Sequence, residues 1–293
     1  CVALWSSWPP SPWLCWGGES VRRVAVQPQA QFRRGRAPGP RRGSGAKTAL
    51  LGHREPWYSA RIMGIPVPTR NRSYWLAAVV ALLACAALLV DVPLSRYAAT
   101  HSLVGDLRKV LDVSEVFAHG LGVLLILVTA AVLDPMRRPR LPRVAACAYG
   151  AGLVANLLKH FIPRIRPNAF DTTADVWTTF LSWRVPDVGS IDVLGRSAVQ
   201  SFPSGHTATA VGLAFGLTWL YPRGRWLFAS FAVLAALQRI QSSAHFLSDT
   251  LAAAAIGCVV SGWILRDSSV GRWFAAREAA GWRRGAGLVR PEV

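Results

Sequence analysis

The chain has 293 residues, of which 52% are hydrophobic and only 16% are charged, against about 25% charged residues in a typical soluble domain. This composition argues against an ordinary soluble enzyme and against a disordered protein. The net charge of +18 is compatible with nucleic-acid binding, but no basic helix or aromatic-basic sheet pattern supports it. The basic residues instead stand in short clusters between long apolar runs, which is typical of membrane proteins. We therefore expect no nucleic-acid partner.

Residues 1–62 differ in composition from everything that follows. They are rich in Trp, Pro, Arg and Gly, carry ten basic against two acidic residues, and have no helical or strand period. Such a segment cannot bury enough apolar surface to offset the entropy lost on ordering. We expect a disordered or non-native extension, with translation beginning at Met63. The alternative is a basic arm that binds anionic lipid.

Six apolar stretches follow Met63. The first two, 73–90 and 116–133, hold 18 uncharged residues each, enough to cross a bilayer. The other four are long enough only if their polar ends are included; they are 144–158, 197–222, 226–238 and 250–265. The predicted fold class is all-α, an integral membrane bundle of six transmembrane helices. The predicted domains are a short basic cytoplasmic tail at 63–73, the membrane domain at 74–266 and a basic cytoplasmic tail at 267–293.

The arginine distribution predicts the orientation. Arginines cluster before the first stretch, between the second and third, between the fourth and fifth, and after the sixth. These four regions lie on one side of the bilayer, which the positive-inside rule makes the cytoplasm. The loop after the first stretch balances its basic residues with acidic ones and falls outside. Its apolar pattern from Leu103 to Leu111 predicts a short amphipathic helix on the membrane surface.

Three polar clusters stand at the ends of these stretches. They are Lys159-His-Phe-Ile-Pro-Arg-Ile-Arg166-Pro167, Pro203-Ser204-Gly205-His206 and Arg239-Ile-Gln-Ser-Ser-Ala-His245-Phe-Leu-Ser-Asp249. Because chain direction alternates between spans, the ends that carry Lys159, His206, Arg239 and Asp249 all face the same side. The arginine count makes that side extracytoplasmic. Polar residues at membrane depth are functional candidates, because removing them from water is costly.

The residue types in these clusters indicate phosphate chemistry. Lys159, Arg166 and Arg239 supply cations that can neutralise a dianionic phosphate monoester. Ser204 and Gly205 stand where a helix begins, and the amides of a helix N-terminus bind anions.

Turnover needs a nucleophile and a proton source. His245, with Asp249 four residues on to hold one ring N–H, suits the nucleophile. His206 suits the general acid that protonates the leaving alkoxide and then the base that activates water.

The three clusters resemble the signature of the type 2 phosphatidic acid phosphatase superfamily, which is related to the haloperoxidases: K-x6-RP, PSGH and SR-x5-H-x3-D. The resemblance covers roughly residues 73–265, and one position departs from it, because Gln238 stands where the family usually has Ser. It implies a phosphohistidine intermediate, the same three catalytic residues (His206, His245 and Asp249), and no metal or other cofactor.

The predicted function is a bacterial inner-membrane phosphatase that hydrolyses a lipid phosphate or pyrophosphate at the extracytoplasmic edge of the bilayer. Candidate substrates are undecaprenyl pyrophosphate, phosphatidylglycerol phosphate and phosphatidic acid. The alternatives are a lipid phosphotransferase with the same site, a vanadate-dependent haloperoxidase, and a non-catalytic transporter or lipid-binding protein. His119 and His160 are expected to be packed or helix-end residues. Asn156 shares a helical face with Lys159 and could line the pocket, but it is not placed in the site, and the loop from 168 to 202 is expected to form a lid or a surface against the headgroups.

Overall fold

The computed structural model describes residues 72–101, 103, 105–170, 175–180, 196–266 and 268–288. All of them belong to the compact unit His53–Val293. The segment 1–62 and most of the loop 168–202 lie outside the described residues, so the predictions made for them stay predictions. The described residues form helices and two isolated backbone bridges but no strand, which confirms the all-α class for this part of the chain.

The N-terminal third of the described chain is built from two bent helix pairs. The helices α2 (Arg72–Ala87) and α3 (Asp91–Thr100) meet at 76°. The helix α4 (Asp106–Ser114) continues into the 3-10 turn η1 (Glu115–Phe117) and meets α5 (Gly120–Leu133) at 74°. The predicted amphipathic helix near Leu111 is therefore present as α4, and it packs on α9 with Leu111 buried.

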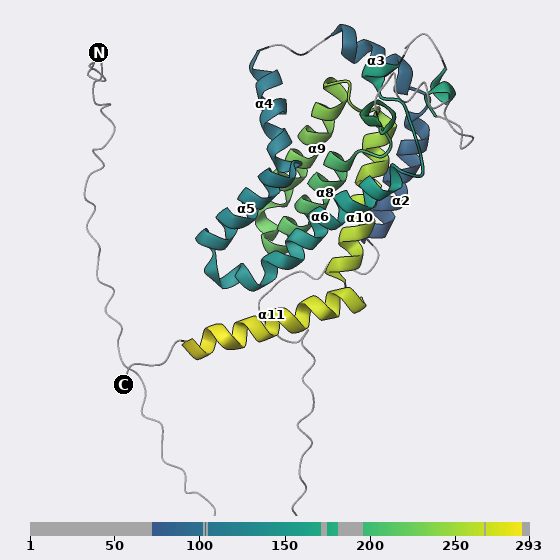
Figure 1. The fold of residues 1–293 in the computed structure, drawn as a ribbon. Helices are drawn as coiled ribbons and strands as arrows, with labels where there is room; N and C mark the ends of the chain where they lie inside the picture. Colours follow the sequence, from purple (N-terminus) through teal and green to yellow (C-terminus); the bar gives the residue numbers. More distant parts are fainter. Residues whose placement is uncertain are drawn as a thin grey trace, which may run out of the picture. The chain divides into compact units, whose positions relative to one another are not determined.

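The centre of the bundle is the close pair α6 (Leu141–Leu158) and α8 (Gly205–Leu220). Figure 1 shows them side by side with α9 (Arg225–Gln241) and α10 (Leu247–Leu265). Small residues allow this approach, since a β-carbon placed on Gly212 would stand 2.2 Å from the carbonyl oxygen of Cys147. Any larger side chain at position 212 would force α6 and α8 apart, and with them the two site clusters that these helices carry.

Fewer helices of the described chain meet the length and polarity expected of a membrane span than the six that the sequence predicted. Two helical segments of the described chain, Pro135–Leu158 and Leu247–Leu265, are long and apolar enough to cross a membrane alone, and each bent pair adds one if it counts as a single span. The helices α8 and α9, with 16 and 17 residues, fall short of that length. The six-span count is therefore not confirmed.

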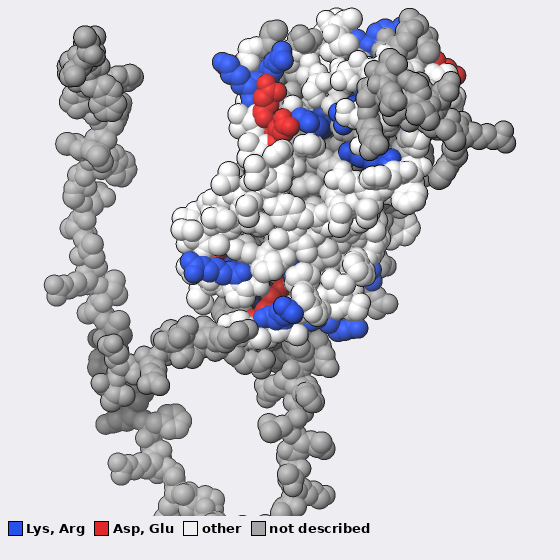
Figure 2. Space-filling view, in the orientation of Figure 1, with Lys and Arg blue, Asp and Glu red and all other residues white. Residues whose placement is uncertain are grey.

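The outer surface of the bundle suits a lipid environment. Large apolar side chains on α2, α5 and α6 are exposed, among them Leu82 at 71%, Leu121 at 67% and Leu153 at 60%. Exposed apolar surface on this scale marks contact with a membrane or a partner. In Figure 2 a broad band without charged side chains separates the charged groups at the two ends of the unit.

The C-terminal region that was predicted as a basic tail contains a helix, α11 (Ser269–Leu288). It packs against α10 and the 3-10 segment η2 (Pro135–Arg140) (Figure 1). Its Glu278 lies 3.0 Å from Nε of Arg143, and both side chains are almost completely buried. Burial raises the pKa of Glu278 to about 6.

Candidate phosphate site

The structure brings the three predicted clusters together at one end of the bundle. Lys159 caps the C-terminus of α6, Ser204 caps the N-terminus of α8, and Arg239 lies in the last turn of α9. Backbone hydrogen bonds tie the clusters to one another. The amide of Ser204 donates to the carbonyl of Asp249, and the amide of His245 donates to the carbonyl of Arg239.

Two of the three cations have no acidic partner among the described residues. Neither Lys159 nor Arg166 forms an ion pair with an acidic residue of the described chain, and the buried Nε of Arg166 has no hydrogen-bond partner there. Burial lowers the pKa of both side chains, and each is lowered further by a neighbouring cation, Arg166 for Lys159 and Arg239 for Arg166. A bound anion would offset both the burial cost and the repulsion. This arrangement fits a phosphate site.

The buried ring of His245 has a defined tautomer. Its Nδ1 lies 2.7 Å from the carbonyl oxygen of Ser201, which only accepts hydrogen bonds, so Nδ1 donates and the lone pair remains on Nε2. Burial lowers the pKa of His245, against the opposing effect of the nearby Asp249 carboxylate. The ring is therefore held neutral, with Nε2 available to attack phosphorus.

Asp249 supports His245 less directly than the sequence predicted. Its Oδ2 lies 3.8 Å from Nδ1 of His245, too far for a hydrogen bond. The same oxygen accepts from the Ser201 hydroxyl at 2.6 Å and from the amide of Phe246 at 2.9 Å. Ser201 thus links the two residues, because its hydroxyl bonds Asp249 and its carbonyl bonds His245.

A buried arginine that the sequence analysis did not single out holds Asp249 in place. Arg164 is completely buried, and its guanidinium donates to Oδ1 of Asp249 through Nη1 and to Oδ2 of Asp91 through Nη2, the latter at 2.8 Å. Ser248 completes this network, since its hydroxyl and its amide donate to Asp91 at 2.5 and 3.0 Å. Arg164 lies inside the first motif at one of its variable positions, so the motif pointed to Arg166, which precedes Pro167, and not to Arg164.

The start of α8 presents the third cluster. The Ser204 hydroxyl is buried and accepts from the amide of Thr207 at 3.4 Å as the helix cap. Gly205 lies against α6, where a β-carbon would come 2.7 Å from Oδ1 of Asn156, so a bulkier residue would clash there. His206 is half-buried, and its ring centroid is 6.1 Å from that of His119. His119 thus stands closer to the site than expected, and Asn156 lies beside Gly205 as its helical face allowed, whereas His160 is exposed.

Glu115 is a further acidic residue at the site, contributed by η1. Its Oε1 is 2.9 Å from Nη2 of Arg239 and 3.7 Å from Nε2 of His206. No motif contains it, and no local pattern distinguishes it from the other acids of its loop.

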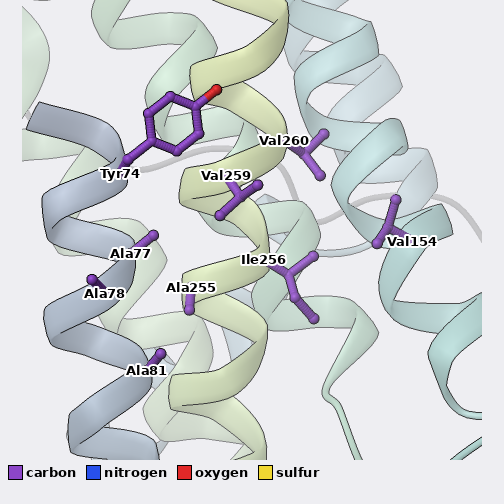
Figure 3. Close-up of a pocket in the computed structure, with 9 residues that line it drawn as sticks. All are labelled: Tyr74, Ala77, Ala78, Ala81, Val154, Ala255, Ile256, Val259 and Val260. Carbon is purple, nitrogen blue, oxygen red and sulfur yellow. The ribbon is translucent and has the colours of Figure 1, made fainter. Parts of the chain in front are cut away.

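An apolar groove of about 450 Å³ lies elsewhere, between α2 and α10 with Val154 of α6 at its side (Figure 3). Ala77, Ala81, Ala255 and Val259 line much of it, and no lining residue is charged. It therefore lacks the cations that a phosphate needs, and the candidate site is the polar cluster at the helix ends.

Comparison with known proteins agrees with the motifs. The PAP2 superfamily model matches residues 141–272, which confirms the resemblance stated from the three clusters. A lipid A 1-phosphatase of Rhizobium etli is 34% identical over 113 residues, 39% of this chain and 42% of that protein. Its counterpart from Rhizobium johnstonii is 34% identical over 110 residues, 36% of this chain and 39% of that protein. The match thus spans about two fifths of these relatives.

A solved structure is also similar, the PAP2-type phosphatidylglycerolphosphate phosphatase of Bacillus subtilis. It has 17% sequence identity and a TM-score of 0.46, over 76% of this chain and 100% of that one.

Proposed function

Because residues 141–272 match the PAP2 superfamily, we propose that the chain is a membrane-embedded phosphatase of lipid phosphates or pyrophosphates. The observation that carries the proposal is the gathering of Lys159 and Arg166, which have no acidic partner in the described part of the chain, near the neutral His245. A site that bound phosphate without hydrolysing it would need only the cations. The oriented imidazole adds a nucleophile.

The proposed reaction has two steps. Nε2 of His245 attacks phosphorus, the bond from phosphorus to the lipid oxygen breaks, and His206 gives its proton to that oxygen. Water then attacks the phosphohistidine while His206 takes a proton from it. The P–N bond breaks, its electron pair returns to His245, and inorganic phosphate leaves. Lys159, Arg166 and Arg239, with the α8 N-terminus at Ser204 and Gly205, bind the phosphoryl oxygens throughout.

The proposed substrate is a lipid phosphate because the site lies at the ends of α6, α8 and α9, and the charged groups at the ends of the bundle border a band without charged side chains (Figure 2). The relatives add lipid A 1-phosphate to the candidates, beside undecaprenyl pyrophosphate, phosphatidylglycerol phosphate and phosphatidic acid.

The decisive assay offers the full chain, purified in detergent, a panel of these four lipids and measures inorganic phosphate. We expect release from at least one lipid, inhibition by vanadate, which mimics the five-coordinate transition state on His245, and little effect of chelators. An added alcohol acceptor distinguishes the phosphotransferase, which would form the phosphorylated acceptor instead of free phosphate. Absence of release from every lipid, with and without acceptor, would contradict the proposal.

We also propose six spans in the inner membrane, with α8 and α9 crossing together with their polar ends and the site facing away from the cytoplasm. The motivation is the side on which the arginines cluster, such as Arg137 and Arg138 between α5 and α6. A reporter fused after Arg272 is expected to behave as cytoplasmic, and one inserted near Asp187 as exported. The reverse result would place the site at the cytoplasmic face and remove the outer-leaflet substrates.

A further inference from the structure

Glu115 contacts two residues of the proposed mechanism but belongs to none of the motifs. It lies in η1, before the region that matches the family model. Its Oε1 stands between Nη2 of Arg239, at 2.9 Å, and Nε2 of His206, at 3.7 Å. A single carboxylate oxygen thus pairs with a phosphate-binding cation and lies beyond hydrogen-bond distance, but within ion-pair distance, of the general acid in its protonated form.

Gln238 completes the arrangement from the next position along α9. Its side chain is 7% exposed, and its Oε1 accepts from Nε of Arg239 at 2.5 Å. Its Nε2 donates to Oε2 of Glu115 at 3.5 Å. Gln238 therefore bonds Arg239 and Glu115 at the same time. The Ser that the family usually has at this position has three fewer side-chain heavy atoms and could not make both contacts.

These contacts occupy one edge of the Arg239 guanidinium. Nε binds the Gln238 amide oxygen and Nη2 binds the Glu115 carboxylate, whereas Nη1 has no hydrogen-bond partner among the residues that the structure describes and can face other groups. Because a guanidinium is planar and its donors point in fixed directions, holding one edge also fixes the direction of the other.

We propose that Glu115 and Gln238 are positioning residues, a pair that directs the free edge of Arg239 to the phosphate and holds the ring of His206 toward the leaving group. The inference deepens the proposed phosphatase function and rests on it. It assigns a role to Gln238, the one departure from the family pattern.

The kinetic test uses Glu115→Ala with two substrates. A lipid phosphate leaves as an alkoxide that needs the proton of His206, whereas p-nitrophenyl phosphate leaves as a stable phenolate. Since general acid catalysis contributes typically about 10²–10⁴-fold, a displaced His206 is expected to lower kcat for the lipid by about tenfold to a hundredfold. For the aryl ester kcat should fall less than about threefold, while KM rises for both because Arg239 is no longer directed.

Control variants separate positioning from general damage. Asp106→Asn removes an acid on the preceding helix α4 whose side chain is 94% exposed, and should match the wild type. Gln238→Ser should raise KM, and its combination with Glu115→Ala should cost less than the product of the two single losses, because the two residues act as one unit. Equal loss of kcat on both substrates, or strictly multiplicative losses, would overturn the proposal.

A binding measurement keeps this proposal separate from the phosphatase function. Titration of the detergent-purified full chain with vanadate needs no turnover, and Glu115→Ala should weaken vanadate binding about three- to tenfold. Tighter binding would mean that Glu115 competes with the phosphate, and would overturn the positioning role. Weaker vanadate binding in a protein that releases phosphate from no lipid would support the pair and reject the phosphatase. If Glu115→Ala keeps the lipid turnover and the vanadate binding of Asp106→Asn, the phosphatase function would be supported and the positioning role of the pair rejected.

Discussion

His245→Ala is expected to abolish lipid phosphate hydrolysis, lowering kcat by about 10⁴-fold or more, as loss of the nucleophile does in other covalent mechanisms. Among the described residues the ring makes one hydrogen bond, from Nδ1 to the carbonyl of Ser201, so its removal leaves Asp249 and its partners in place. Lys159, Arg166 and Arg239 also remain. The variant should therefore still bind vanadate non-covalently while its turnover is lost.

The covalent step can be observed directly. After rapid quenching with a phosphate-labelled substrate, the wild type should carry an acid-labile, base-stable label, and His245→Ala should carry none. His206→Ala should accumulate the label when the substrate is an aryl phosphate, because formation of the intermediate then needs no acid while its hydrolysis still needs a base.

His160→Ala is the matched control for these variants. His160 follows Lys159 directly, is exposed, and its Nδ1 contacts the carbonyl of Asn156 in its own helix turn. It should keep normal turnover and labelling. A labelled His245→Ala protein, or one with full activity, would contradict the assignment of the nucleophile.

The sequence was sufficient to predict which polar residues meet. The three motifs end or begin apolar stretches, and alternation of chain direction alone placed Lys159, His206, Arg239 and Asp249 at one end. The structure brings these residues together there. The spacing of His245 and Asp249 also predicted neighbours, but not the intervening Ser201, since the loop that carries Ser201 reaches them from 44 and 48 positions away.

What the sequence did not predict depends on long-range pairing. Arg164 and Arg166 differ by two positions, yet one turns inward to two carboxylates and the other has a buried Nε without a partner in the described chain. Asp91 follows an apolar run without any motif, and its partner Ser248 is 157 residues away.

The two bends and the C-terminal helix were missed for a similar reason. Hydropathy reports length and polarity, but it does not report a change of direction such as the 76° bend between α2 and α3. The many Arg and Gly residues of α11 do not suggest a packed helix. Its Glu278 pairs with Arg143 of α6, which is far away in the sequence.

Arg164→Met is expected to be the most destabilising substitution in the described part of the chain. It removes the cation between two carboxylates that are each no more than 1% exposed, Asp91 and Asp249. Breaking a buried ion pair by removing one partner costs about 3–5 kcal/mol, because the remaining charge is left without compensation in a medium of low dielectric constant. The measurement is the Tm of the detergent-purified chain. We expect a clear decrease, with Arg164→Lys between the wild type and Arg164→Met because an ammonium cannot bond both carboxylates through a planar fork.

Arg108→Met provides the matched surface comparison. Its ion pair with Asp112 spans 3.9 Å between side chains that are 62% and 59% exposed, and such pairs contribute about 0–1 kcal/mol. A Tm for Arg164→Met equal to that of Arg108→Met would contradict the role of the buried network.

Activity distinguishes a structural role of Arg164 from a positioning role. Arg164 holds one oxygen of Asp249, whose other oxygen receives the hydrogen bond of Ser201, and the carbonyl of Ser201 orients His245. Arg164→Lys, assayed well below its Tm, should therefore lower kcat while leaving KM and vanadate affinity nearly unchanged, because the phosphate-binding cations are not disturbed.

Asp91→Asn is the complementary variant, since it leaves Arg164 paired with Asp249. It should lower Tm yet retain most of kcat, because the connection from Arg164 through Asp249 and Ser201 to His245 remains intact. If Asp91→Asn reduced kcat as strongly as Arg164→Lys, the loss would be attributed to general destabilisation of the network, and the positioning role of Arg164 would be contradicted.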